Sequence, residues 1–282
     1  MEIKKVAVIG GGTMGNGITH LFALYGFQTI LCEISEELFQ KAFETISKNL
    51  DRQVNKNVIS LEQKEKTLKN ISKCIGVENL SSDVDLYIEA IYENKEAKFN
   101  LFNKLKNISN SNSIIATNTS SISITELSSA VNPDKFIGMH FMNPVPVMKL
   151  VEIIRGYSTS DETFNTIKEL AIKLDKTPVE VFDYPGFVSN RILMPMINEA
   201  IFALMEGVAS KEDIDNVMKL GMNHPMGPLT LADFIGLDVC LSIMEVLYNG
   251  FNDPKYRPCP LLKKMVAANK LGRKTGEGFY KY

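Results

Sequence analysis

The chain has 282 residues, 45% of them hydrophobic, and this length suits one large domain or two ordinary ones. Lys and Arg (31) nearly balance Asp and Glu (33), so the charge indicates neither a nucleic-acid surface nor an acidic tail. No apolar run is long enough for a membrane span, and four cysteines without CxxC spacing predict free thiols, no metal site and a reducing, cytoplasmic location.

The N-terminal part alternates strand and helix patterns. Residues 5–9 form a short apolar run that ends in glycines, which is typical of a buried strand. Residues 13–25 carry a helical pattern, and Gly26 suits the end of that helix. A second apolar run covers residues 27–32. The polar segment 35–72 predicts one or two long helices inserted between strands.

The same alternation continues through the middle of the chain. The apolar runs predict further strands, and the periodic segments between them predict helices. The predicted strands are 86–91, 114–117, 136–141, 148–154 and 177–182, and the predicted helices are about 95–106 and 161–174.

The pattern changes after Pro185-Gly186, where helical periodicity broken by Pro and Gly replaces the alternation. Alternating strands and helices followed by a helical block predict an α/β fold, with a Rossmann-type dinucleotide-binding domain and an all-α domain. The expected domains are residues 1–184, with an inserted helix pair, and residues 185–282, for substrate binding and dimerisation.

A glycine-rich segment follows the first strand and opens the first helix. Gly10, Gly12 and Gly15 match the spacing GxGxxG, which in this strand–turn–helix context favours dinucleotide binding. Gly10 permits the tight turn, Gly12 leaves room for a pyrophosphate, and Gly15 allows close packing of the helix on the sheet. The N–H groups of the first helical turn, at Thr13 and Met14, would then face the anion.

Glu33 ends the second strand, 18 residues after Gly15. A carboxylate there accepts both ribose hydroxyls of NAD and repels a 2′-phosphate, so NAD is favoured over NADP. Ile34 and Ser35 follow, without the Arg or Lys that a 2′-phosphate would need. A glycine-rich turn with a solvated Glu33, and a Rossmann fold for another adenine ligand such as a methyl donor, stay open as alternatives.

His140 ends a predicted strand, at the edge of the sheet where open α/β folds bind ligands. Its neighbours Met139 and Phe141 equally suit a structural histidine in the core. Glu152 lies in another apolar strand, where a buried carboxylate needs a partner. A return of the chain between the two strands would pair it with His140 and orient the imidazole ring. Such a pair suits proton transfer coupled to hydride transfer, although a purely structural pair stays open.

Two further polar segments lie near the expected site. Thr117-Asn118-Thr119-Ser120-Ser121 follows the end of a strand, and Asn190 opens the helical domain. Taken alone, each segment equally fits a helix cap or a turn. His20, inside the first helix, and His224, in a Pro-rich loop, are interpreted as structural.

Together these segments resemble the short-chain 3-hydroxyacyl-CoA dehydrogenase family, in particular its bacterial 3-hydroxybutyryl-CoA members. The resemblance covers essentially the whole chain and rests on several long motifs. They are Ile9 to Gly17, Glu89 to Asn94, Asn118 to Ser121, Gly138 to Arg155, Pro185 to Asn198, Asn223 to Asp238, and Leu271 to Tyr280.

The resemblance implies roles for residues at matching positions. His140 would be the general acid/base and Glu152 its orienting partner. Ser120 and Asn190 would hydrogen-bond the reacting oxygen or the thioester carbonyl. Contacts to the nicotinamide half of NAD are implied for Glu93, Lys98, Asn118 and Asn143, and contacts to CoA phosphates for Arg52 and Lys56.

The resemblance also implies an acyl-CoA substrate, a short acyl chain, a role in fatty-acid or butyrate metabolism, and a homodimer or dimer-based oligomer. Some positions depart from the family pattern. Asn49, near the expected CoA phosphates, replaces a common Ser; Thr117 also replaces a Ser, and Met142 replaces a Phe. A dehydrogenase of a free hydroxy acid and a non-catalytic nucleotide-binding protein are the alternatives. The joint presence of Ser120, His140, Glu152 and Asn190 argues against the second.

Overall fold

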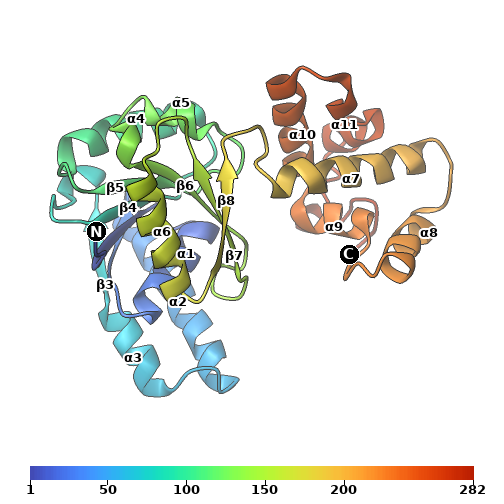
Figure 1. Ribbon diagram of the computed structural model, residues 1–282. Coiled ribbons are helices and arrows are strands. Elements are labelled where there is room, and N and C mark those ends of the chain that lie inside the picture. Colours follow the sequence, from blue (N-terminus) through green and yellow to red (C-terminus); the bar gives the residue numbers. More distant parts are fainter. The chain divides into compact units, whose positions relative to one another are not determined.

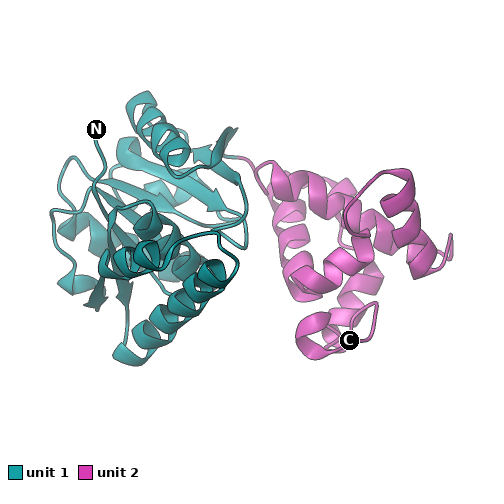
Figure 2. Ribbon diagram, turned by 90° about the horizontal axis from the view of Figure 1, so that it is seen from below, with its two compact units in different colours: residues 1–183 teal, residues 184–282 magenta.

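The computed structural model describes residues 1–282, which divide into two compact units, Met1–Asp183 (unit 1) and Tyr184–Tyr282 (unit 2) (Figure 2). Unit 1 is a sheet covered by helices, and unit 2 is helical (Figure 1). The predicted class, a Rossmann-type α/β domain followed by an all-α domain, is therefore confirmed. No helix in either unit has both the length and the apolar composition needed to cross a membrane.

One eight-stranded sheet forms the centre of unit 1, in the order β3-β2-β1-β4-β5-β6-β7-β8. All neighbouring strands run parallel except β6 and β7, which are antiparallel. The order reverses between β1 and β4, which is the switch point where open α/β sheets bind ligands. The strands are β1 (Lys5–Ile9), β2 (Gln28–Glu33), β3 (Ile71–Ile75), β4 (Leu86–Glu89), β5 (Ile114–Thr117), β6 (Phe136–Phe141), β7 (Leu150–Arg155) and β8 (Thr177–Phe182).

Helices cover both faces of this sheet. One face packs on α1 and α6 in a single apolar core, which includes Phe22 of α1 and Ile167 of α6. The other face lies against α4, where Phe102 meets Phe136 of β6 edge-to-face at 5.0 Å between ring centroids. The helices of unit 1 are α1 (Thr13–Leu24), α2 (Glu36–Asn55), α3 (Leu61–Lys69), α4 (Lys95–Ile108), α5 (Ile124–Ser128) and α6 (Asp161–Lys173).

Alternation along the strands puts the polar residues of interest on the α4 face. Ile88, Ala116 and Met139 belong to the core beneath α1 and α6. Side chains one position further along each strand therefore point to the opposite face. This places Glu89, Thr117, His140 and Glu152 on one face of the sheet, at or near the ends of β4, β5 and β6 and on the paired strand β7.

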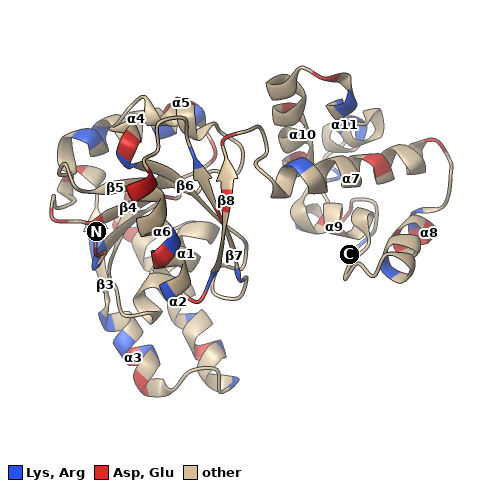
Figure 3. Ribbon diagram, in the orientation of Figure 1, with Lys and Arg blue, Asp and Glu red and all other residues tan.

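The segment predicted as helical over residues 35–72 departs from the prediction at its end. It forms two helices, α2 and α3, each with a serine N-cap, Ser35 and Ser60. Residues 71–75 then add strand β3 at the edge of the sheet. The five-residue strand exposes Lys73 beside the polar end of α3, so its apolar pattern is weak. The hairpin of α2 and α3 carries charges of both signs (Figure 3).

Unit 2 contains its own apolar core, which includes Ile197, Leu229, Met244 and Leu262. Its longest helix, α7, tolerates an internal proline, Pro195. The helices are α7 (Ser189–Met205), α8 (Lys211–Asn216) with a following π-turn, α9 (Pro228–Ile235), α10 (Leu237–Phe251) and α11 (Pro260–Ala267).

Candidate active site

The loop between β1 and α1 is built for a close-approaching anion. Gly10 has a φ of +96°, and a Cβ on Gly15 would lie only 1.7 Å from the carbonyl oxygen of Gly10. Both glycines are thus required by the fold of the loop itself. A Cβ on Gly12 would meet no protein atom within 4 Å. The space beside Gly12 therefore suits a ligand at the N-terminus of α1, where the N–H groups of Thr13 and Met14 begin the helix.

Glu33 lies across this loop at the end of β2. Its carboxylate accepts hydrogen bonds from the backbone N–H of Gly11 and, at 3.0 Å, from that of Ile34. These contacts hold the carboxylate beside the glycine loop, in the position that a ribose diol takes in Rossmann folds. The residues present therefore fit the adenosine half of NAD.

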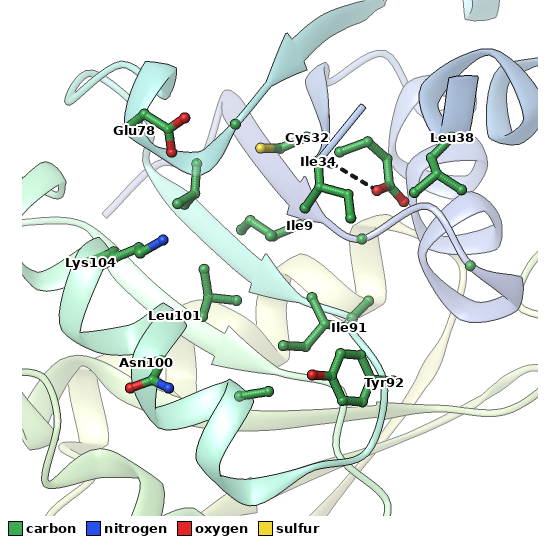
Figure 4. Close-up of a pocket in the computed structure, with 17 residues that line it drawn as sticks. Ile9, Cys32, Ile34, Leu38, Glu78, Ile91, Tyr92, Asn100, Leu101 and Lys104 are labelled. Atoms are coloured by element: carbon green, nitrogen blue, oxygen red, sulfur yellow. Dashed lines mark hydrogen bonds between the residues drawn. The ribbon is translucent and has the colours of Figure 1, made fainter. Parts of the chain in front are cut away.

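A cavity of about 540 Å³ opens at this edge of the sheet (Figure 4). Its walls are mostly apolar, with Ile9, Ile91 and Leu101 among the side chains that project into it. Glu33 also belongs to its lining. A mostly apolar cavity with a carboxylate in its lining suits an adenosine group. Further lining comes from the glycine loop, from the segment after β3, from the segment between β4 and α4, and from α4, including Gly12, Gly76, Glu78, Tyr92, Asn100 and Lys104.

Beyond the glycine loop, the end of β4 carries a buried ionic cluster. Lys98 of α4 is about 1% exposed and places its ammonium 2.5 Å from Glu89 and 3.3 Å from Glu93. Glu89 also accepts hydrogen bonds from Thr117 Oγ1 at 2.5 Å and from the N–H of Ile91 at 2.7 Å. The predicted residues Glu93 and Lys98 are thus brought together, with Glu89 as a third member.

Glu93 in turn fixes the loop that carries Ser120. Its Oε1 accepts hydrogen bonds from the N–H groups of Ser120 (3.0 Å) and Ser121 (3.1 Å) and from Thr119 Oγ1 (2.5 Å). Burial opposes ionisation of Glu93, but Lys98 and these hydrogen bonds outweigh it and hold the pKa below its ordinary value. A single carboxylate therefore sets the position of the Ser120 loop.

His140 and Glu152 face one another across the antiparallel pair β6–β7. They are register partners, and His140 Nδ1 lies 2.7 Å from Glu152 Oε2. The imidazole is 10% exposed and the carboxylate 2% exposed. The contact fixes the ring and directs Nε2 away from Glu152, because the two nitrogens lie on opposite sides of the imidazole. The chain therefore does return between these two residues and brings their side chains into contact, as predicted.

Asn118 links the cofactor edge to this pair. Its Oδ1 accepts a hydrogen bond at 3.0 Å from the N–H of Phe141, the residue after His140. The side-chain amide nitrogen of Asn118 is then the group that can donate to a ligand. The dinucleotide loop at β1, the ionic cluster at β4 and β5, and the His–Glu pair at β6 thus lie in this order along the carboxyl edge of the sheet.

Comparison with known proteins gives the same assignment for the whole chain. Residues 5–184 match the family model "3-hydroxyacyl-CoA dehydrogenase, NAD binding domain", and residues 186–282 match "3-hydroxyacyl-CoA dehydrogenase, C-terminal domain". The chain belongs to the 3-hydroxyacyl-CoA dehydrogenase family. It is therefore an NAD-dependent dehydrogenase, as its glycine loop and Glu33 predict.

Individual relatives agree over their full lengths. The 3-hydroxybutyryl-CoA dehydrogenase of Bradyrhizobium diazoefficiens is 54% identical over 99% of this chain and 96% of that protein. The human mitochondrial hydroxyacyl-coenzyme A dehydrogenase is 43% identical over 99% of this chain and 91% of its own length. The crystal structure of (S)-3-hydroxybutyryl-CoA dehydrogenase from Ralstonia eutropha superposes with a TM-score of 0.97 at 50% identity, covering 100% of this chain and 99% of that one.

Three residues that the family resemblance selects lie on or at the end of α2 and α7, and not on the sheet that bears the His–Glu pair. Arg52 and Lys56 are exposed at the C-terminal end of α2. Glu36 begins α2 just after Glu33, at the cofactor edge of the sheet. The rise of the helix puts Arg52 about 24 Å along α2 from Glu36. Arg52 also donates to Asn49 Oδ1 at 3.2 Å. Asn190 is buried in the first turn of α7, in unit 2.

Lys176 was missed by the sequence analysis of this dehydrogenase. Its ammonium is buried and donates to the carbonyls of Val145 (2.6 Å) and Met148 (2.8 Å), in the loop between β6 and β7. Val145 also packs against Gly17 of α1, since a Cβ there would lie 3.0 Å from it. Lys176 thereby holds the loop of residues 142–149, which contains Asn143 and joins the strands of His140 and Glu152.

Proposed function

We propose that this chain interconverts 3-hydroxybutyryl-CoA and acetoacetyl-CoA with NAD(H), using His140 as general acid/base and Glu152 as its orienting partner. The observation that carries the proposal is the 2.7 Å contact of His140 with Glu152 on the sheet edge that also bears the dinucleotide loop. Relatives named 3-hydroxybutyryl-CoA dehydrogenase, such as that of Bradyrhizobium diazoefficiens, support the short acyl chain.

The direction of proton transfer follows from which ring nitrogen of His140 contacts Glu152. With Nδ1 donating to Glu152, Nε2 is the base that accepts the proton of the C3 hydroxyl while hydride leaves C3. In the reverse direction, Nε2–H gives its proton to the oxygen of the 3-oxo group. When bound at the glycine loop and Glu33, NAD+ would supply the hydride acceptor for oxidation and NADH the hydride donor for reduction. The buried carboxylate of Glu152 stabilises the imidazolium that forms in oxidation.

Other residues are proposed to bind and orient the ligands. Ser120 and Asn190 would hydrogen-bond the reacting oxygen or the thioester carbonyl. Arg52 and Lys56 would pair with CoA phosphates, which suits cationic side chains at an exposed helix end. For the nicotinamide half of the cofactor the proposed contacts are Glu93, Lys98, Asn118 and Asn143.

The division of labour between the chain's parts is also a proposal. Residues 1–184 would bind NAD and carry the inserted helix pair, and residues 185–282 would bind substrate and form a homodimer. Exposed apolar side chains of unit 2 such as Ile192, Val208 and Leu220, each at least 68% exposed, support a subunit interface there. Light scattering should give twice the mass of one chain.

Four unpaired cysteines support a cytoplasmic location.

The first experiment compares substrates and cofactors directly. Oxidation of NADH is followed by absorbance with acetoacetyl-CoA, with free acetoacetate, and with NADPH in place of NADH. We expect rapid oxidation only with acetoacetyl-CoA and NADH. Comparable activity on free acetoacetate would favour a hydroxy-acid dehydrogenase, and comparable use of NADPH would contradict the role of Glu33.

His140→Ala tests the acid/base assignment. We expect turnover to fall by at least about 10³-fold, because neither direction then has a proton donor or acceptor at C3. The affinity for NADH should stay within about twofold, since no dinucleotide contact is assigned to His140. NADH binding by fluorescence and steady-state rates measure the two effects. Weak NADH binding in this variant would instead make His140 a structural residue.

A further inference from the structure

Glu89 is a wholly buried carboxylate that the proton chemistry of His140 does not use. Its two oxygens accept hydrogen bonds from Lys98 Nζ, the N–H of Ile91 and Thr117 Oγ1, all within 2.7 Å. Two of these partners, the ammonium of Lys98 and the N–H of Ile91, can only donate, so this surrounding suits the ionised carboxylate.

The cluster around Glu89 contains more negative than positive side chains. One ammonium, that of Lys98, serves two carboxylates, Glu89 and Glu93. No other Lys or Arg forms an ion pair with either carboxylate, so the formal charge of the cluster is −1. Burial raises the pKa of Glu89, against the opposing effects of Lys98 and the hydrogen bonds. Little solvent screens the charge at Glu89, since the side chains of Glu89 and Lys98 are at most 1% exposed, whereas that of Glu93 is 37% exposed.

The sheet places this cluster beside the reacting end of the cofactor. Adenosine is assigned to the end of β2 at Glu33, and the pyrophosphate to the β1–α1 loop, so the nicotinamide must extend over β4 and β5. Hydride transfer also requires it to lie near His140. Glu89 is the last residue of β4, and strand spacing puts its Cα about 10 Å from that of Gly138, on the strand of His140.

We propose that the cluster of Glu89, Lys98 and Glu93 is a fixed negative charge that favours binding of NAD+ over NADH at the nicotinamide subsite. The oxidised ring carries a positive charge and the reduced ring is neutral, so a nearby negative charge stabilises only the first. This inference rests on the proposed function. Its consequence is that enzyme-bound NADH becomes a stronger hydride donor, which favours transfer of hydride to C3 of the 3-oxoacyl group and of a proton from His140 to its oxygen.

The test measures the dissociation constants of both cofactors in Glu89→Gln. Glutamine keeps the shape and an acceptor for Lys98 but removes the charge. NADH is titrated by its fluorescence, and NAD+ by displacement of NADH. We expect the ratio Kd(NAD+)/Kd(NADH) to rise about tenfold over the parent, for a unit charge lost at roughly 10 Å in a medium of intermediate dielectric constant.

Two matched variants separate charge from packing. Glu89→Asp keeps the charge and changes the geometry, whereas Thr117→Val removes one hydrogen bond to Glu89 and no charge. Both should leave the ratio within about twofold of the parent. An unchanged ratio in Glu89→Gln, or an equal rise in Thr117→Val, would overturn the inference.

If circular dichroism shows that Glu89→Gln does not fold, Glu93→Gln removes the other carboxylate at a less buried position. The same rise is expected, and an unchanged ratio there would equally overturn the inference. Because binding is measured without substrate, this result is independent of the proposed reaction. Failure of the parent to reduce acetoacetyl-CoA would contradict the proposed function. The ratio Kd(NAD+)/Kd(NADH) in Glu89→Gln would still decide whether the cluster favours NAD+.

Discussion

The side chain of Glu152 offers the most direct test of the His–Glu pair. In Glu152→Gln the amide can still contact Nδ1 of His140, but it no longer stabilises a protonated ring. We expect kcat to fall by roughly 10²-fold, with NADH affinity unchanged. Glu180→Gln on β8 is the control, because that exposed glutamate pairs with Arg155 at 3.2 Å and should not affect turnover. A Glu152→Gln enzyme with the parent's kcat would remove Glu152 from the mechanism.

Individual residues differ in how far the sequence reveals them. Glu152 could be predicted because a carboxylate in an apolar strand needs a partner and His140 is only twelve positions away. Glu89 carries the same signal in Leu-Tyr-Ile-Glu, but its partners lie on α4 and β5, up to 28 positions away. Lys176 contacts only backbone carbonyls, which no residue type marks. Neither arrangement follows from the local pattern.

Among the elements, the β1–α1 loop contains two glycines with different tasks. Gly15→Ala would push its Cβ into a backbone oxygen 1.7 Å away, so we expect a loss of more than about 2 kcal/mol in unfolding free energy. Gly12→Ala meets no protein atom and should unfold like the parent, but should bind NADH at least about tenfold more weakly, because the methyl group occupies the pyrophosphate space. Thermal unfolding and NADH titration distinguish them. Equal stability losses in both variants would contradict this division.

Helix α1 also carries His20, whose burial predicts a pH dependence of stability. Neither ring nitrogen has a well-aligned hydrogen bond, and burial lowers the pKa of His20 to about 4, against a raising effect of Gln53. The unfolded chain, with a pKa near 6.5, binds this proton first. Stability should therefore be complete above about pH 6.5 and decline as the pH falls towards 4, by up to about 3 kcal/mol.

Replacing His20 isolates this contribution. In His20→Gln the free energy of unfolding, measured in urea between pH 7 and 4.5, should decline less steeply than in the parent. His224→Gln, in the loop before α9, serves as a control for the loss of a histidine and should follow the parent. Parallel pH curves for the parent and His20→Gln would show that His20 takes up no extra proton on unfolding.

Helices and strands could be predicted from the sequence wherever the apolar residues formed a clear run or a clear helical repeat. The strands that begin at Lys5, Ile114 and Phe136 are apolar runs, and their existence was predicted from that pattern. β3 was missed because an edge strand of five residues, with Lys73 exposed, resembles the polar helix before it. Pairing direction was harder, since the antiparallel pair β6–β7 depends on the chain's return and not on strand composition.

At the scale of the whole molecule, composition and order of elements were enough to predict two parts of different class. Each unit buries its own apolar cluster, so the strand–helix alternation and the later helical block each specify a core. The contacts that close unit 2 could not be predicted. They join α9 to the C-terminal segment, across about 46 positions, through a single buried carboxylate, Asp233.

Asp233 accepts hydrogen bonds from the N–H groups of Phe279 (2.9 Å) and Tyr280 (2.8 Å) and from Tyr282 Oη (3.2 Å). Asp233→Ala leaves these donors without an acceptor, and we expect unit 2 to lose about 2–4 kcal/mol of unfolding free energy. Asp253→Ala, in an exposed turn of the same unit, should lose under about 1 kcal/mol. Because the dinucleotide residues belong to unit 1, the NADH dissociation constant of Asp233→Ala should stay within twofold of the parent's. Calorimetry and NADH titration measure the two effects, and a matching loss of NADH affinity at a temperature where unit 2 is folded would mean that the units are energetically coupled.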